Sequence, residues 1–167
     1  MIIFKITDDL LRAINEDLSR QHPFAAERIG FLTVRSARAG KATLLLATGY
    51  YSIPDDQYVD DSYSGARINS QAISGALQLS LDTGDGVFHV HAHYFGNSIP
   101  SFGRMDMRET PKIVASLQAV KPEVAHGMLL LNYEKLFGLV RLPGAETLFK
   151  IDKLIVVGYP TKFSINS

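Results

Sequence analysis

The sequence predicts a single mixed α/β domain of the α+β class, in which helices flank one central mixed β-sheet. The 167 residues are the size of one ordinary domain, and a hydrophobic content of 46% is enough for one buried core. Apolar segments of strand length and amphipathic segments of helix length follow one another without strict βαβ alternation. We therefore expect residues 1–167 to form one domain around one sheet.

Helices are predicted where apolar residues recur at helical spacing. Leu11, Ile14 and Leu18 show this spacing after Thr7 and Asp8, which are good N-capping residues. The dipeptide His22-Pro23 is expected to end that helix, because the residue before a proline disfavours the helical conformation. The predicted helices cover residues 8–21, 69–81 and 106–119.

Strands are predicted where short apolar segments lie between turn residues. Ala39-Gly40-Lys41 is a turn between two such segments and predicts a hairpin. The polar, acidic segment 52–67 is expected to be a surface loop. The predicted strands cover residues 2–6, 29–34, 42–50, 87–93, 127–132, 137–142 and 148–157.

Charge and cysteine content narrow the classes of function. Lys+Arg and Asp+Glu are both 17, so the net charge of 0 gives no footprint for nucleic acid or for an anionic membrane. The absence of cysteine excludes a disulfide scaffold and a thiolate zinc site. No signal-peptide pattern and no apolar run of about 20 residues is visible. We expect a cytoplasmic protein with neither nucleic acid nor membrane as partner.

Three of the five histidines form the segment His89-Val-His91-Ala-His93. Side chains at i, i+2 and i+4 of a strand point to one face, and imidazole nitrogen suits zinc, copper, iron and nickel. Catalytic zinc commonly has three protein ligands and a water, so two histidines need a third ligand. Asp106, at the start of the third predicted helix, is one candidate, although an N-cap role alone would account for it. His89 is the other candidate, and His126 is expected to be structural.

The segment Glu27-Arg-Ile-Gly30-Phe-Leu32, the His-x-His pair at His91 and His93, and Gly103-x-x-Asp106 together resemble the JAMM (MPN+) metalloproteases. The pattern of that family is a glutamate before a glycine-containing apolar strand, then His-x-His-Pro, then Ser-x-x-Asp after a short loop. The order and spacing agree over residues 25–140, which is most of the chain.

The resemblance implies an MPN-like fold, a sandwich similar to that of cytidine deaminases. It implies a zinc ion held by His91, His93 and Asp106, a zinc-bound water as nucleophile and Glu27 as general acid/base, with His89 in a supporting role. The implied reaction is cleavage of peptide or isopeptide bonds after a ubiquitin-like protein. Ubiquitin-like proteins or their conjugates are the implied partners, together with E1-like and E2-like enzymes, because bacterial relatives resemble partners of such enzymes, some of them in antiviral defence.

Two positions depart from the family pattern. Tyr94 replaces the proline after His-x-His, and Gly103 replaces the serine whose hydroxyl helps to stabilise the oxyanion. Losing one such donor costs about 10²–10³ in rate. Ser98 and Ser101 are the candidate replacements. Moving the alignment to use Ser101 as the motif serine would put Arg104 at the ligand position, where a cation cannot serve.

Three functions follow from these residues. The leading one is an active zinc peptidase or isopeptidase. The second is a catalytically weak or inactive MPN-type scaffold that binds a ubiquitin-like or conjugation partner, consistent with the loss of the motif serine at Gly103. The third is a different metal enzyme that uses His89, His91 and His93 together.

Overall fold

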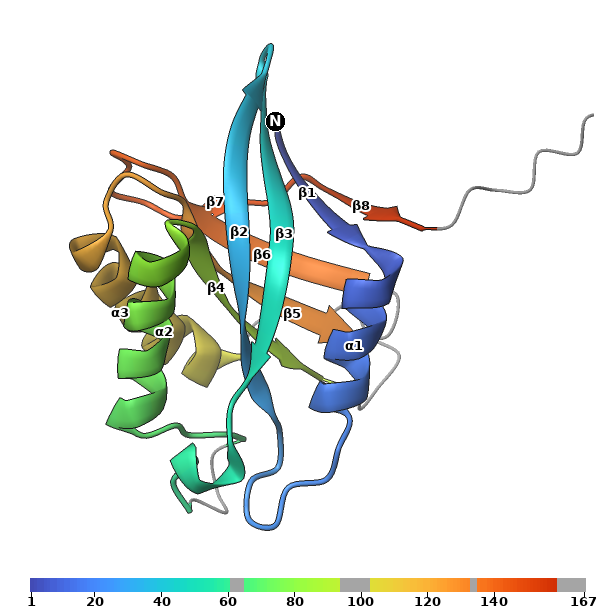
Figure 1. Cartoon of the computed structure of the whole chain (residues 1–167), viewed down its shortest axis with the longest axis vertical. Coiled ribbons are helices and arrows are strands. Elements are labelled where there is room, and N and C mark those ends of the chain that lie inside the picture. Colours follow the sequence, from blue (N-terminus) through green and yellow to red (C-terminus); the bar gives the residue numbers. More distant parts are fainter. Residues whose placement is uncertain (61–64, 94–102, 133–134, 159–167) are drawn as a thin grey trace, which may run out of the picture.

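The computed structural model describes residues 1–60, 65–93, 103–132 and 135–158, and within these ranges it gives only the backbone of residues 104–107, 110 and 135. In the described part, one eight-stranded sheet runs through the molecule and three α-helices pack on it (Figure 1). The strands are β1 (Ile2–Thr7), β2 (Ile29–Ala39), β3 (Ala42–Ser52), β4 (Gly86–Ala92), β5 (His126–Asn132), β6 (Lys135–Arg141), β7 (Phe149–Lys150) and β8 (Lys153–Val157).

The sheet is mixed, with the strand order β7-β6-β5-β4-β2-β3-β1-β8. Strand β4 runs parallel to β5, and β1 runs parallel to both of its neighbours, while the other pairs are antiparallel. The predicted fold class, a mixed α/β arrangement around one mixed sheet, is confirmed. The predicted hairpin is also present, because β2 and β3 pair along their length and turn at Gly40, whose φ is +60°.

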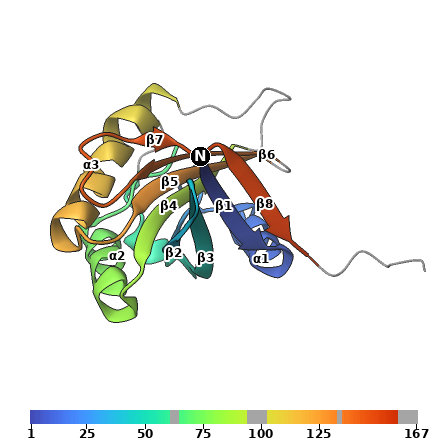
Figure 2. The same ribbon diagram turned by 90° about the horizontal axis from the view of Figure 1, so that it is seen from above.

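The prediction of one strand over residues 148–157 is wrong. The segment divides into β7 and β8, which lie at opposite edges of the sheet. The Ile151 amide donates to the Gly138 carbonyl in β6, and the next amide, that of Asp152, donates to the Ile2 carbonyl in β1. Two adjacent residues therefore bond to β6 and β1, the strands next to the two edges, and the sheet curls back on itself, as the view in Figure 2 shows.

The helices lie close to their predicted positions. They are α1 (Asp8–Leu18), α2 (Ser70–Thr83) and α3 (Arg104–Val120), with a short 3₁₀ helix η1 (Asp55–Gln57) before α2. Helix α1 begins where predicted, since the Thr7 side chain accepts a hydrogen bond from the Leu10 amide. Helix α3 starts two residues earlier than predicted and contains Pro111 within it.

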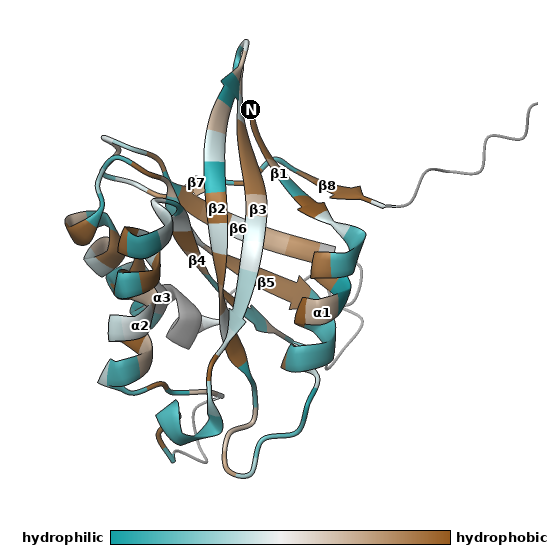
Figure 3. Ribbon diagram, in the orientation of Figure 1, coloured by the Kyte–Doolittle hydropathy of each residue, from teal (hydrophilic) through white to brown (hydrophobic). Residues whose placement is uncertain are grey.

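Two apolar cores lie on the two faces of the sheet. On one face, Ile14 and Leu18 of α1 pack with Leu32 and Val90. On the other face, the buried part of α2 and α3 packs with the opposite side of the same strands, including Phe31 of β2. Strands β4 and β5 are buried along their entire described length, which matches the hydrophobic colouring of β5 in Figure 3. The alternation along β4 places its histidines on the α2 and α3 face.

Candidate metal centre

His89 and His91 lie in β4 and His93 directly follows it, and the three imidazoles form a row. Ring centroids lie 5.3 Å apart between His89 and His91 and 5.1 Å apart between His91 and His93. This spacing agrees with the predicted common face of the strand. His89 and His91 are buried, while the His93 side chain is 30% exposed. The row therefore leads from the core to the surface at the carboxyl end of β4.

Glu27 lies next to His93, in the segment that precedes the neighbouring strand β2. Strand β2 is antiparallel to β4, with Ile29 opposite His91. Extending that register by two residues puts Glu27 opposite His93. The Glu27 Oε1 atom lies 3.5 Å from His93 Nε2, and the Glu27 side chain is 29% exposed. A residue from the segment before β2 and the residue directly after β4 thus meet at one edge of the buried core.

Glu27, His91 and His93 form a group that can hold a metal ion. Each offers one ligand atom, and these three atoms all lie within 4.8 Å of one another. Two imidazole nitrogens and a carboxylate oxygen are a donor set that zinc accepts. In a tetrahedral site with ligands about 2.0–2.1 Å from the metal, ligand atoms lie about 3.3 Å apart. The distance between Glu27 and His93 is close to that, so Glu27 can act either on the metal or beside it.

Asp106, the predicted third ligand, is the third residue of α3 and lies in its first turn. The Asp106 side chain lies outside the described residues, so its role as a ligand stays a prediction. Gly103 directly precedes α3 and is exposed. Tyr94, Ser98 and Ser101 also lie outside the described part of the chain.

Among the described residues, His89 does not belong to the group of Glu27, His91 and His93 that can hold a metal ion. Its ring lies 6.2 Å from that of Phe31, in edge-to-face orientation, and it is 5% exposed. The arrangement gives His89 the position of a residue that packs behind His91.

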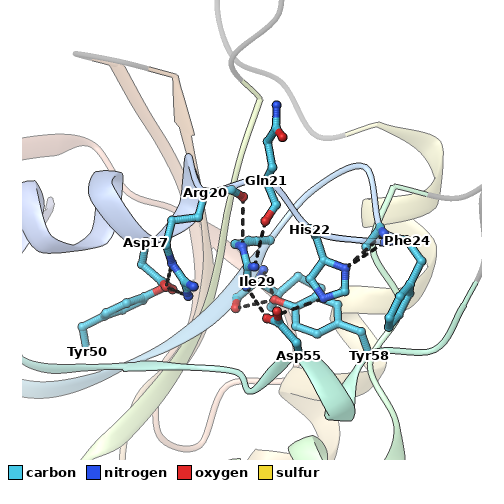
Figure 4. Close-up of polar contacts among 11 residues, drawn as sticks. Asp17, Arg20, Gln21, His22, Phe24, Ile29, Tyr50, Asp55 and Tyr58 are labelled. Carbon is cyan, nitrogen blue, oxygen red and sulfur yellow. Dashed lines mark hydrogen bonds and ion pairs between the residues drawn. The ribbon is translucent and has the colours of Figure 1, made fainter.

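A polar cluster beneath the Glu27 segment escaped the sequence interpretation (Figure 4). Arg28 is 3% exposed and its guanidinium donates to Asp55 Oδ1 at 2.7 Å. That hydrogen bond holds the pKa of the Asp55 carboxyl below its ordinary value. Burial lowers the pKa of His22 and raises that of Tyr58. The sequence signal for this cluster was the position of Arg28 between Glu27 and an apolar strand. An arginine that is buried there requires hydrogen-bonding partners.

No family model matches the chain, and no curated protein matches its sequence. Within the described ranges, no helix combines the length and the apolar character that a membrane-spanning helix needs.

Proposed function

We propose that the protein is a zinc-dependent peptidase or isopeptidase that cleaves bonds after a ubiquitin-like protein. The observation that carries the proposal is the convergence of Glu27 with His91 and His93, because Glu27 is far from the two histidines in the sequence and the sheet brings it next to them. The order of these residues, and of Asp106 after them, is that of the JAMM pattern. Cofactor and substrate class both come from that resemblance.

In this proposal, His91, His93 and Asp106 hold the zinc ion. When bound, zinc lowers the pKa of a coordinated water and polarises the carbonyl of the scissile bond. The Glu27 carboxylate accepts the proton that the attacking water loses and returns it to the leaving amine nitrogen. The distance of 3.5 Å between Glu27 Oε1 and His93 Nε2, and the 29% exposure of the Glu27 side chain, support this role for Glu27.

The scaffold function is the second candidate, and Gly103 is the observation that favours it. A glycine offers no side-chain donor to an oxyanion, and the loss of one donor costs about 10²–10³ in rate. A scaffold would keep the fold and bind a ubiquitin-like or conjugation partner without cleaving it.

The first test compares Glu27→Gln with wild-type protein for zinc content and for cleavage of a linear ubiquitin-like fusion. Zinc is measured by elemental analysis. We expect wild-type protein to hold one zinc per chain, and Glu27→Gln to keep that zinc while losing about 10²-fold or more in kcat. The matched control is Glu16→Gln, which makes the same change at an exposed site on α1.

Each contrary result has a separate meaning. If Glu27→Gln loses the zinc, Glu27 is a ligand and the acid/base assignment is wrong. If His91→Ala and His93→Ala keep full zinc content, the metal site is wrong. Stoichiometric zinc with no cleavage, and with binding of the ubiquitin-like protein, would support the scaffold.

A further inference from the structure

We propose that Arg28, Asp55, His22 and Tyr58, here called the Glu27 clamp, are positioning residues that hold Glu27 beside the metal-binding histidines. The inference rests on the proposed function, since it gives Glu27 the acid/base role. Glu27 lies in the connection between α1 and β2, outside any helix or strand. A segment of this kind does not by itself hold a side chain within a fraction of an ångström.

Arg28 is the centre of the Glu27 clamp. Its Nε donates to the Arg20 carbonyl at 2.9 Å, its Nη2 to the Gln21 carbonyl at 3.0 Å, and its Nη1 to Asp55 at 2.7 Å. One planar guanidinium thus ties the start of the connection, its end and η1 to one another (Figure 4 labels Arg20, Gln21 and Asp55). A lysine ammonium cannot reproduce this planar fork.

His22 fixes the middle of the connection. Its Nδ1 accepts from the amides of Phe24 at 3.3 Å and Ala25 at 3.1 Å. Because Nδ1 accepts, the proton of the neutral ring is on Nε2, which lies 3.7 Å from Asp55 Oδ1. The ring packs between the rings of Phe24 and Tyr58, with centroids 4.5 Å and 4.3 Å away.

Tyr58 fixes the backbone after Glu27. Its hydroxyl accepts from the Ile29 amide at 2.8 Å and donates to the Ile29 carbonyl at 3.1 Å, and both contacts are buried. On the other side of Glu27, the Ala26 amide donates to the Gly65 carbonyl at 2.9 Å. Glu27 therefore sits between anchored neighbours, at positions 26 and 28–29.

None of these described contacts uses the Glu27 carboxylate. The Glu27 clamp holds the backbone and leaves the carboxylate facing His93. A general base needs this combination, because a carboxylate tied by a buried guanidinium would lose basicity. A misplacement of about 1 Å from a mutation outside the reacting groups can cost on the order of 10²-fold in rate.

The experiment uses Arg28→Lys and Tyr58→Phe, which keep charge and ring respectively and remove only hydrogen-bonding geometry. Their matched controls are Arg12→Lys, exposed on α1, and Tyr51→Phe, exposed on β3. In metal-free protein, we expect amide exchange at Ala26 and Ile29 to be on the order of tenfold faster in both clamp variants and unchanged in both controls. In zinc-loaded protein, we expect kcat to fall about 10–100-fold with KM nearly constant.

The variants are then combined with Glu27→Gln. If the Glu27 clamp acts through Glu27, Arg28→Lys causes no further loss of kcat in the Glu27→Gln background. An equal loss in both backgrounds would overturn the inference, as would unchanged exchange at Ala26 and Ile29. Should Glu27→Gln alone leave cleavage intact, the proposed function fails, and the exchange rates still decide whether these residues hold the segment.

Discussion

At the scale of single residues, the close approach of Tyr50 explains why position 30, three residues after Glu27, is a glycine. A Cβ atom built at Gly30 would lie 2.3 Å from the ring of Tyr50. Tyr50 crosses the backbone there and donates a hydrogen bond to Asp17 in α1. Burial raises the pKa of Tyr50, so its hydroxyl remains a donor at neutral pH. The glycine thus lets α1 and β3 close over the start of β2.

Gly30→Ala is expected to destabilise the protein by about 1–3 kcal/mol, because an added methyl group must displace the Tyr50 ring. The measurement is urea unfolding. The control is Gly75→Ala, in the interior of α2, where an added Cβ meets nothing within 4 Å. That change should stabilise by about 0.5–1 kcal/mol, since alanine is the better helix former. Equal effects of the two substitutions would contradict the packing role of Gly30.

At the scale of elements, sequence periodicity predicted most helices and strands, but apart from the hairpin of β2 and β3 the sequence did not predict which strands pair. Periodicity reports which face of an element is buried, and it correctly put His89, His91 and His93 on one face. It carries no information on neighbours, so the break in 148–157 and its opposite-edge pairing were missed. Of the candidate site, His91 and His93 were singled out because three histidines share one face of a strand, and Glu27 was singled out by the resemblance to the JAMM pattern. Arg28 was missed because its burial depends on the tertiary structure.

His126 joins three elements, and its expected structural role fits its contacts. The ring is fully buried in β5, accepts from the Val87 amide in β4 at 3.1 Å, and its Nε2 lies 3.0 Å from the Lys121 carbonyl after α3. Burial lowers the pKa of His126 below 6.5. The neutral ring is therefore the form that holds β4, β5 and α3 together.

The lowered pKa of His126 predicts a pH-dependent stability. Because the unfolded chain takes up a proton on this ring at a higher pH than the folded chain does, its stabilisation is complete above pH 6.5. It is lost as pH falls below that value towards the folded pKa. Urea unfolding of metal-free protein at several pH values should show a smaller decline towards acid for His126→Gln than for wild type. Parallel curves would refute the prediction.

At the scale of the whole molecule, the two faces of the curled sheet differ in the side chains that β4 contributes to them. On the face with α1, the side chains that β4 contributes to the core are apolar, namely Phe88, Val90 and Ala92. The face with α2 and α3 carries the histidine row, which ends at the surface beside Glu27. The buried strand β4 thus presents the proposed metal-binding histidines, and the connection before β2 brings the proposed acid/base residue, Glu27, next to them.

Asp152 ties the connection between β7 and β8 to β1. Its Oδ2 accepts from the Ile2 amide at 2.6 Å, and its own amide donates to the Ile2 carbonyl. Asp152→Ala removes the first bond and should lower the free energy of unfolding by about 1 kcal/mol. Calorimetric melting can measure this, with Asp56→Ala, exposed in η1, as the matched control. A change no larger than that of the control would show that the connection between β7 and β8 stays on β1 without this carboxylate.

The pairing of β1 with β8 also has a consequence for the folding of the chain during its synthesis on the ribosome. Ile2 and Asp152 are 150 residues apart along the chain, so the outer edge of β1 finds its partner only when synthesis has passed residue 157. Until then the nascent chain presents a row of unpaired backbone groups to neighbouring chains. Strand β8, the last described strand to be synthesised, is the one that covers this edge of β1.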